Sequence, residues 1–328
     1  MSLVIKIIQF PRKESVDRLS NIYPTNPFFT FAYAQARKLS GHKPVLFEYY
    51  QDKEFINGFI AFEQNGVINK SIEVPSFPPI TSDYNFWNIF INELSRKRYS
   101  HVNLGSFSSP AKFTVPELNV IVGKRERCEY HLNLMDSGNR LNKSANHKRN
   151  IKKARNFGIK ILKGVDSREA CERHSELIDF SMNRRARGSK IKKTNHVSST
   201  LNYIQTNSGK LFQASLNQRV LSSVLILEAE RGIYYHSAGT SEEGMALGAS
   251  HFLIDEIADE YRNQSKWLFN LGGTLQDQTG LQRFKKGFGA TPIKLETFDM
   301  YVGGYLKKIL TAAAYFLKGN GYSYIRRI

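Results

Sequence analysis

The sequence predicts an α+β protein made of two tandem halves of similar topology, with mixed, largely antiparallel sheets. At 328 residues the chain suits two domains of about 100–200 residues each. Helical and strand-like periodicities occur in the same order in both halves. Two short matches, Leu46-Phe47 with Leu211-Phe212 and Asn103-Leu104-Gly105 with Asn270-Leu271-Gly272, are offset by 165 and 167 residues. A nearly constant offset is expected of an internal duplication.

The first half is expected to run helix, three strands, helix, strand. The first helix spans 27–39, with Pro27 at its first position after a capping Asn26. Period-two and apolar runs then predict strands at 45–50, 55–62 and 67–74. After a proline-rich break at 75–79, the pattern predicts an amphipathic helix at 84–98 and a short strand at 101–104.

The second half repeats this order. A helix at 197–206 precedes strands at 210–216, 220–228 and 233–238, a helix at 245–262 and a strand at 267–271. A connecting region carries a strand at 129–134, a basic helix at 141–157 ended by Gly158, a strand at 159–163 and a helix at 167–185. We therefore expect an N-terminal domain at 1–125, a C-terminal domain with the cleft at 126–300, and a tail at 301–328.

The formal net charge of +18 favours partners rich in negative charge. The charge is concentrated in two acid-free blocks. Residues 140–160 hold eight basic side chains, and residues 184–193 hold six. One such residue is most simply a solvated surface charge, but two blocks together favour anion binding.

Several protein classes are disfavoured by the sequence. No apolar run approaches the roughly 20 residues of a membrane span, and the start lacks a secretory signal. Cys128 and Cys171 are too far apart for a metal knuckle, and the histidines show no ligand spacing. We expect a cytoplasmic protein without a bound metal or cofactor. The basic, partly amphipathic segment 305–317 either docks on the core or lies on the inner face of a membrane.

Two segments resemble the Fem family of aminoacyltransferases. His147–Arg155 followed by Phe157-Gly158-Ile159 is similar to the family's basic segment R-x-x-I-x-K-A-x-x-x-G-hydrophobic. Phe269-Asn270-Leu271-Gly272-Gly273, with 280–289 reading GLQRFKKGFG, is similar to its C-terminal signature G-L-x-x-F-K-x-x-F-G. The early Phe28-Phe29-Thr30 and the prolines at 75–79 also fit. The resemblance spans about residues 20–300, in the family's order.

The resemblance implies two fused domains of the GNAT N-acyltransferase fold. Fem proteins transfer an amino acid from aminoacyl-tRNA to the peptide stem of a peptidoglycan precursor, and related GNAT proteins belong to polysaccharide systems and use acyl thioesters. The expected donor is therefore aminoacyl-tRNA or acyl-CoA, and the acceptor a phosphate-bearing envelope precursor. The usual GNAT pyrophosphate loop, Arg/Gln-x-x-Gly-x-Gly/Ala, is represented by Met245-Ala246-Leu247-Gly248-Ala249, which lacks the first polar residue.

Acyl transfer to an amine needs an oriented nucleophile, a proton acceptor and donors aimed at the developing oxyanion. We expect these groups where strand 233–238 diverges from strand 267–271. Lys285 matches the family's F-K-x-x-F-G lysine and is the expected charge. His236 is the candidate proton acceptor, with a structural histidine as the alternative, and Tyr235 contacts substrate or packs in the core.

The donor and phosphate groups have separate candidates. Small residues before the long helix, which would let a phosphate or thioester approach its first turn, predict a donor site at Gly244, Gly248, Ala249 and Ser250. Four basic residues are candidates for binding phosphate: Arg149 and Lys153, which share a helix face, and Arg185 and Arg187.

Two other functions remain open on the sequence. One is an acyl-CoA-dependent N-acetyltransferase of an amino sugar. The other is a basic nucleic-acid-binding protein without chemistry, although zinc-finger spacing and an RNP-type aromatic motif are missing from the sequence.

Overall fold

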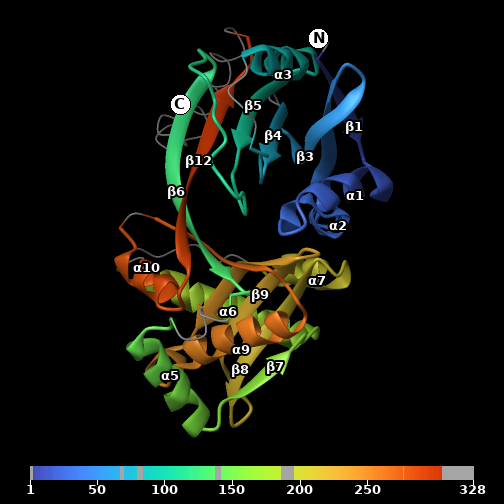
Figure 1. Ribbon diagram of the computed structural model, residues 1–328. Coiled ribbons are helices and arrows are strands. Elements are labelled where there is room, and N and C mark those ends of the chain that lie inside the picture. The colour runs from blue at the N-terminus through green and yellow to red at the C-terminus, as the bar shows by residue number, and fades with distance from the viewer. Residues whose placement is uncertain are drawn as a thin grey trace, which may run out of the picture. The chain divides into compact units, whose positions relative to one another are not determined.

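The computed structural model describes residues 3–66, 70–79, 84–136, 142–185, 196–275 and 277–304. Its contacts divide the chain into two compact units (Figure 1). The first unit comprises residues 1–19, 41–127 and 294–328, and the second comprises 20–40 and 128–293. The segment 20–40 thus packs with the C-terminal unit, although the sequence placed it in a domain at 1–125. The predicted tail segment 305–317 lies outside the described residues.

The first unit is built around six strands in the order β1-β2-β3-β4-β5-β12. All neighbouring pairs for which a register is given are antiparallel except β4 with β5. Its elements are β1 (Leu3–Gln9), α1 (Lys13–Ile22), β2 (Lys43–Gln51), β3 (Glu54–Asn65), β4 (Lys70–Val74), α3 (Tyr84–Arg96), β5 (Tyr99–Leu104) and β12 (Thr291–Tyr301). β1, α1 and β12 were not predicted.

Aromatic side chains fill the core of the first unit. The predicted amphipathic helix is α3, which buries Phe86, Trp87, Phe90 and Leu94 at helical spacing. Phe47 and Phe59 stack across neighbouring strands with ring centroids 4.9 Å apart. This packing accounts for the stability of the unit, and we assign it no chemical role.

The second unit contains the strands β6-β11-β10-β9-β8-β7, in that order. β10 and β11 are parallel, and the other neighbouring pairs are antiparallel. The strands are β6 (Ile121–Asn133), β7 (Lys160–Lys163), β8 (Gly209–Leu216), β9 (Arg219–Glu228), β10 (Gly232–Thr240) and β11 (Leu268–Thr274). The helices are η1 (Pro27–Phe29), α2 (Phe31–Leu39), α5 (Ala145–Asn156), α6 (Arg168–Arg185), α7 (Val197–Gln205), α8 (Glu242–Ala246), α9 (Ala249–Asn263) and α10 (Thr279–Lys286).

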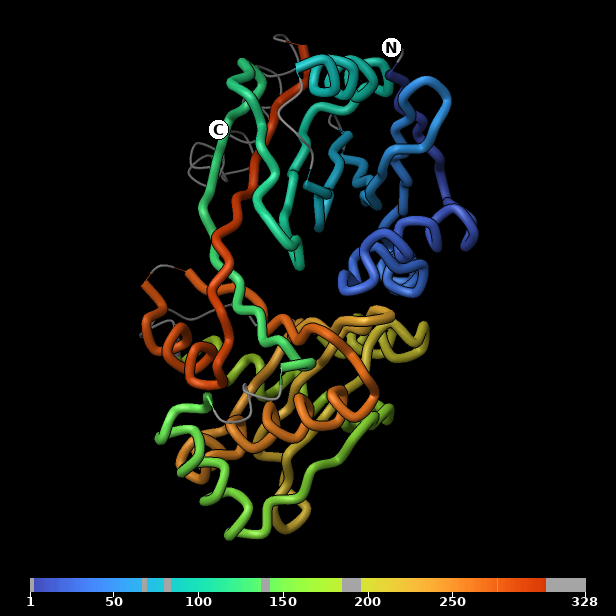
Figure 2. The backbone as a smooth tube through the Cα atoms, in the orientation of Figure 1, coloured from blue at the N-terminus to red at the C-terminus, as the bar shows by residue number. Residues whose placement is uncertain are grey.

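Alternation along the strands places helices on both faces of this sheet. Phe212 and Val224 belong to the apolar core with α9. The residues next to them in sequence face α6 on the other side of the sheet: Gln213 donates to Ala170 O, and Ser223 bonds to His174. α5 packs along α9 (Figures 1 and 2). No helix in the described part of the chain has both the length and the apolar character of a membrane span.

Two predicted helices are interrupted. Asn26 caps as expected, with Oδ1 accepting from Phe28 N at 3.0 Å, but the chain turns at Thr30, which caps α2 through a bond from Tyr33 N. The predicted helix 245–262 is divided into α8 and α9 at Gly248, whose φ of +76° is left-handed.

Candidate functional site

The parallel strands β10 and β11 separate after a short paired region. Their register covers three pairs, ending at Tyr234 opposite Asn270. At the same level the β10–β9 register shifts between Tyr235 and Ser237, and the β11–β6 register shifts between Asn270 and Gly273. The predicted divergence of these strands is therefore confirmed. Backbone N–H and C=O groups of β10 and β11 beyond this pair are not bonded to each other. This is the position where we expected the catalytic groups.

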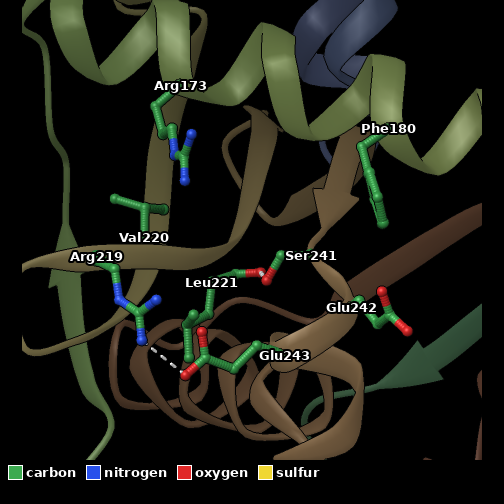
Figure 3. Close-up of a pocket in the computed structure, with 8 residues that line it drawn as sticks. All are labelled: Arg173, Phe180, Arg219, Val220, Leu221, Ser241, Glu242 and Glu243. Atoms are coloured by element: carbon green, nitrogen blue, oxygen red, sulfur yellow. Dashed lines mark hydrogen bonds and ion pairs between the residues drawn. The ribbon is translucent and has the colours of Figure 1, made fainter.

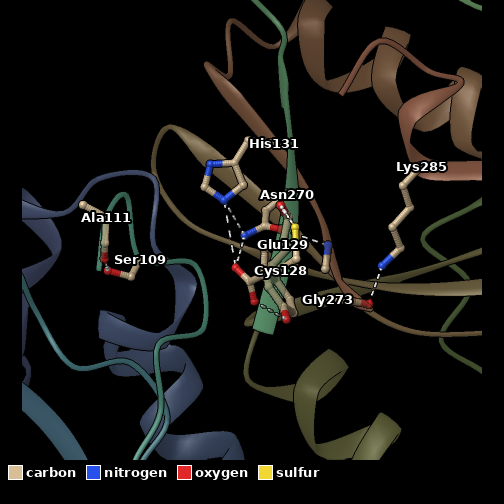
Figure 4. A network of polar contacts seen from close by, with 10 residues as sticks. Ser109, Ala111, Cys128, Glu129, His131, Asn270, Gly273 and Lys285 are labelled. Carbon is tan, nitrogen blue, oxygen red and sulfur yellow. Dashed lines mark hydrogen bonds and ion pairs between the residues drawn. The ribbon is translucent and has the colours of Figure 1, made fainter. Parts of the chain in front are cut away.

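Lys285 of α10 lies beside this divergence. The residue is 4% exposed, and its Nζ donates to Gly273 O at 2.7 Å (Figure 4). The Nζ also lies 5.8 Å from the ring centroids of Tyr130 and Tyr235. Two aromatic faces and a carbonyl stabilise a cation here. The structure thus brings the predicted Lys285 and Tyr235 together.

Gly272 lies among these groups with no side chain of its own. Its φ is +74°, a left-handed conformation. A β-carbon on Gly272 would lie 3.7 Å from Lys285 Nζ, 3.8 Å from the Tyr234 hydroxyl and 3.0 Å from Tyr235 O. A cationic donor and a phenol therefore converge on the bare side of this glycine.

A buried carboxylate lies behind the same position. Glu129 of β6 is fully buried. Its oxygens accept from the Tyr234 hydroxyl at 3.1 Å and from Asn270 Nδ2 at 2.7 Å, and His131 Nε2 lies 3.9 Å away (Figure 4). Asn270 Oδ1 in turn accepts from Gly272 N at 2.8 Å. This network ties β6, β10 and β11 together where their ladders are irregular.

His236 points to a different group of residues. Its ring packs against Tyr203 of α7, with centroids 5.0 Å apart, whereas Tyr235 faces Lys285. Desolvation by surrounding protein, followed by the charge of Arg37, lowers the pKa of His236, although the residue is exposed. A neutral imidazole is able to accept a proton. The role of His236 as the proton acceptor stays a prediction.

The facing of residues in β10 departs from strict alternation. Along a regular strand at 233–238, Tyr235 and Ser237 would lie on one face and Ala238 on the other. Ser237 instead contacts His174 of α6, and Ala238 joins Tyr235 against the α9 core. The register shift between Tyr235 and Ser237 inserts one extra residue, which reverses the facing of those that follow.

α10 is held in place by α5. Ser144 N donates to Gly287 O at 2.9 Å. The buried ring of His147 contacts Ser144 Oγ through Nδ1 and Phe284 O through Nε2, both at 2.8 Å. A carbonyl only accepts, so Nε2 carries the hydrogen and Nδ1 accepts from the serine in the neutral ring. This contact fixes the turn of α10 that carries Lys285.

We expect acid to weaken this junction. Burial, and then the neighbouring His147, lower the pKa of His251 to about 4, and the two rings lie 4.6 Å apart. Because the pKa of His251 in the folded protein lies below the usual value of about 6.5, protonation of this ring favours the unfolded chain. The free energy of unfolding is therefore highest above pH 6.5 and decreases as the pH falls towards about 4. The unfolding free energy should drop by about 1–3 kcal/mol over this window.

Chemical denaturation of wild type and His251→Leu at several pH values tests this expectation. The variant should show a shallower loss between pH 6.5 and 4, with pH 7.5 as the reference for each protein. An equally steep loss in the variant would assign the acid sensitivity to other groups.

The predicted donor-binding loop is packed against protein. Ser241 caps Gly244 N at 3.0 Å, and a β-carbon on Gly244 would overlap Leu221 O. A β-carbon on Gly248 would lie 2.6 Å from Asn150 O of α5, and Ala249 is fully buried. Of the four predicted donor residues, Ser250 is partly accessible.

The predicted phosphate-binding residues have different surroundings. Arg149 and Lys153 are both exposed on α5. Arg149 donates to Asn146 Oδ1 and Lys153 donates to Ala246 O, each at 2.8 Å. The Arg185 side chain and Arg187 lie outside the described residues. Phosphate binding by these residues stays a prediction.

A surface groove of about 460 Å³ lies next to α8 (Figure 3). Its lining residues are Arg173, Phe180, Arg219, Val220, Leu221, Ser241, Glu242 and Glu243. Two of these residues, Arg219 and Glu243, pair at 2.9 Å. None of the predicted site residues lines this groove.

The sequence reasoning missed several members of the site region. Glu129 lies in a predicted strand, but charged and polar neighbours surround it in the sequence, so no local signal marked it as buried. Arg37 and Tyr33 of α2 belong to the second unit, where Arg37 Nη1 donates to the Tyr33 hydroxyl at 3.1 Å and Tyr33 stacks with Tyr203. No local pattern indicated that α2 crosses to this unit.

Comparison with known proteins supports the resemblance. Residues 181–314 match the model of the FemAB family, while no curated protein matches the chain. The crystal structure of FemX aligns with a TM-score of 0.63 at 12% identity, covering 93% of this chain and 99% of that one. A tandem GNAT protein from the clavulanic acid biosynthesis pathway aligns with a TM-score of 0.58 at 9% identity, covering 92% and 99%.

A protein of unknown function from Bacteroides thetaiotaomicron aligns with a TM-score of 0.55 at 12% identity, covering 92% of this chain and 99% of its own. At 9–12% sequence identity, these similarities show a shared fold. Residues 181–314 therefore match the FemAB family model, and the fold is similar to those of FemX and a tandem GNAT protein, as the resemblance predicted.

Proposed function

We propose that this protein is an N-acyltransferase that moves an aminoacyl or acyl group to an amine of a cell-envelope precursor, in peptidoglycan or polysaccharide synthesis. The FemAB match supports the class of reaction. The observation that carries the proposal is the buried Lys285 beside the divergence of β10 and β11, with Tyr234, Tyr235 and Gly272 around it.

The geometry suits attack on a carbonyl. The amine nitrogen forms a bond to the donor's carbonyl carbon, and the carbonyl oxygen takes up negative charge. Lys285 supplies the positive charge that stabilises this oxygen in a poorly hydrated setting, where such a group is effective. Collapse breaks the bond from the carbonyl carbon to the carrier, and the proton lost by the amine ends on the departing carrier group.

We infer that the donor is aminoacyl-tRNA rather than acyl-CoA. A bound diphosphate needs free backbone N–H groups at a helix start. Here α8 carries Glu242 and Glu243 in its first turn, which repel phosphate. The backbone of Asn150 in α5 lies directly against Gly248, and Lys153 Nζ donates to Ala246 O. The exposed basic residues of α5 suit a polyanionic donor better than a small cofactor.

Acetyl-CoA is accordingly expected to bind weakly, with a Kd above about 1 mM in titration calorimetry. Binding requires α5 to leave α9, which removes apolar contacts in the core. A Kd in the micromolar range would show that this loop opens, and would favour the amino-sugar N-acetyltransferase instead.

Turnover tests the function itself. Total tRNA charged with radiolabelled amino acids is incubated with a nucleotide-linked peptidoglycan precursor, and label in the precursor is measured by chromatography. Transfer by wild type that requires both substrates supports the proposal. Absence of transfer, together with salt-sensitive binding of uncharged tRNA, would favour a nucleic-acid-binding protein without chemistry.

A further inference from the structure

A second hollow, of about 350 Å³, lies between the start of α6 and the edge strand β7 of the second unit's sheet. Its lining residues are Leu162, Val165, Asp166, Ser167, Glu169, Ala170, Arg173, Gln213 and Val220. Arg173 and Val220 also line the groove next to α8 (Figure 3). None of the residues of the candidate transfer site lines this hollow.

Gln213 of β8 is the buried member of this lining. It is 2% exposed, whereas the other lining residues are half-buried or exposed. Its Nε2 donates to Ala170 O at 2.9 Å and to Ser223 Oγ at 3.4 Å. Both hydrogens of the amide nitrogen are therefore bonded to protein. Since a flipped amide would lose both bonds, the orientation of the Gln213 side chain is fixed.

The carbonyl oxygen of Gln213 has no such partner. Oε1 accepts no hydrogen bond from a described residue and is not enclosed by protein. It is therefore open to the hollow that Gln213 lines. A carbonyl at a largely buried position gains free energy when it accepts a hydrogen bond, so the hollow favours a ligand that donates one.

The unpaired charge at the hollow is negative. Asp166 precedes α6, and Glu169 lies in its first turn. Both are exposed, and exposed carboxylates are ionised at neutral pH. Within the described part of the chain neither forms an ion pair, whereas Arg173 is paired with Glu176 at 2.6 Å, outside the lining. A cationic ligand is therefore preferred, in a chain whose net charge is +18.

We propose that this hollow binds a primary alkylammonium group. The ammonium donates a hydrogen bond to Gln213 Oε1 and is attracted by Asp166 and Glu169. Its alkyl chain lies against the apolar lining residues Leu162, Val165 and Val220. The site is separate from the candidate transfer site, so the inference does not depend on the proposed reaction. A free alkylamine and the lysine side chain of a peptide share this chemistry, and the probes below distinguish them.

A titration of the full chain with pentylammonium chloride tests the site. The probe should shift the NMR resonance of the Gln213 side-chain amide, which is identified by its absence in Gln213→Met. We expect a Kd of about 0.1–1 mM at low ionic strength, and weaker binding when salt is added. 1-Pentanol, which has the same chain without the charge, should bind at least about 10-fold more weakly. Equal binding of the two probes, or no shift with pentylammonium, would overturn the proposal.

Two isosteric substitutions test the charge. The double variant Asp166→Asn/Glu169→Gln should raise the Kd for pentylammonium about 3- to 10-fold, as expected for the loss of two exposed charge pairs. Asp179→Asn, on the same helix but outside the lining, should leave the Kd within about 1.5-fold of wild type. An unchanged Kd in the double variant would overturn the proposal. Because a first-turn acid also stabilises its helix, the melting temperature of each variant is measured alongside.

A third probe identifies the source of the ammonium group. N-acetyl-lysine N-methylamide carries the same head group on a peptide backbone. Tighter binding of this probe than of pentylammonium would support the site and assign it to a lysine of a peptide. Binding of pentylammonium alone would support the site and assign it to a free amine. Because no acyl donor is present, these results stand whether or not the protein catalyses transfer.

Discussion

Replacing Lys285 by Met is expected to lower kcat/KM for transfer about 100- to 1000-fold. Methionine retains the aliphatic volume of the buried side chain but removes the charge beside the bare side of Gly272. Loss of one oxyanion-stabilising group has effects of this size. Transfer of labelled amino acid to the precursor, measured over a range of both substrates, gives the value.

The neighbouring lysine provides a matched control. Lys286 is exposed on α10, so Lys286→Met removes the same charge from the same helix away from the divergence of the strands. Its activity should stay within about twofold of wild type, as for most surface substitutions. Equal losses in the two variants would indicate a general effect of net charge. An active Lys285→Met with an intact fold would remove the lysine from the mechanism.

Gly287→Ala is expected to lower the melting temperature by about 5–10 °C, the effect of roughly 2–3 kcal/mol in a chain of this size. The backbone of Gly287 has an ordinary helical φ of −63°, so the effect does not arise from strain. The added methyl group would overlap the ring of His147. It would separate α5 from α10, and the displaced turn of α10 would also reduce transfer.

Two further variants show whether this overlap is the cause. His147→Ala in the Gly287→Ala background should be destabilised by less than the sum of the single variants, because the methyl group then has room. Gly280→Ala places a methyl group on the same helix where no atom lies within 4 Å, and its melting temperature should stay equal or rise slightly. A similar drop for Gly280→Ala would mean that α10 tolerates no substitution.

Local patterns predicted most of the elements because each depends on neighbours in sequence. The helical spacing of α3 and α9, the capping by Asn26 and the apolar runs of β8, β9 and β10 are short-range features. Lys285 was found through a motif whose phenylalanines and glycines pack α10 against α5. The unpredicted β1 and β12 carry no comparably strong local pattern.

Residues that act through distant partners were the ones missed. Glu129 is 105 residues from Tyr234 and 141 from Asn270, so no spacing rule connects them. Closure of the donor loop by Asn150 is likewise a contact between α5 and the start of α9. The extra residue in β10 shifted the facing of Ser237 and Ala238, since a bulge depends on the pairing of two strands.

The sequence by itself determined the α+β class, the repeated order of elements, the strong positive charge and the position of the lysine motif, since these follow from composition and local periodicity. Tertiary structure alone decided that α2 packs with the second unit, that the buried Glu129 of β6 bonds to side chains of β10 and β11, and that α5 covers the donor loop. Burial and hydrogen bonding between segments far apart in the chain depend on how the strands pair and the helices dock, which local patterns do not specify.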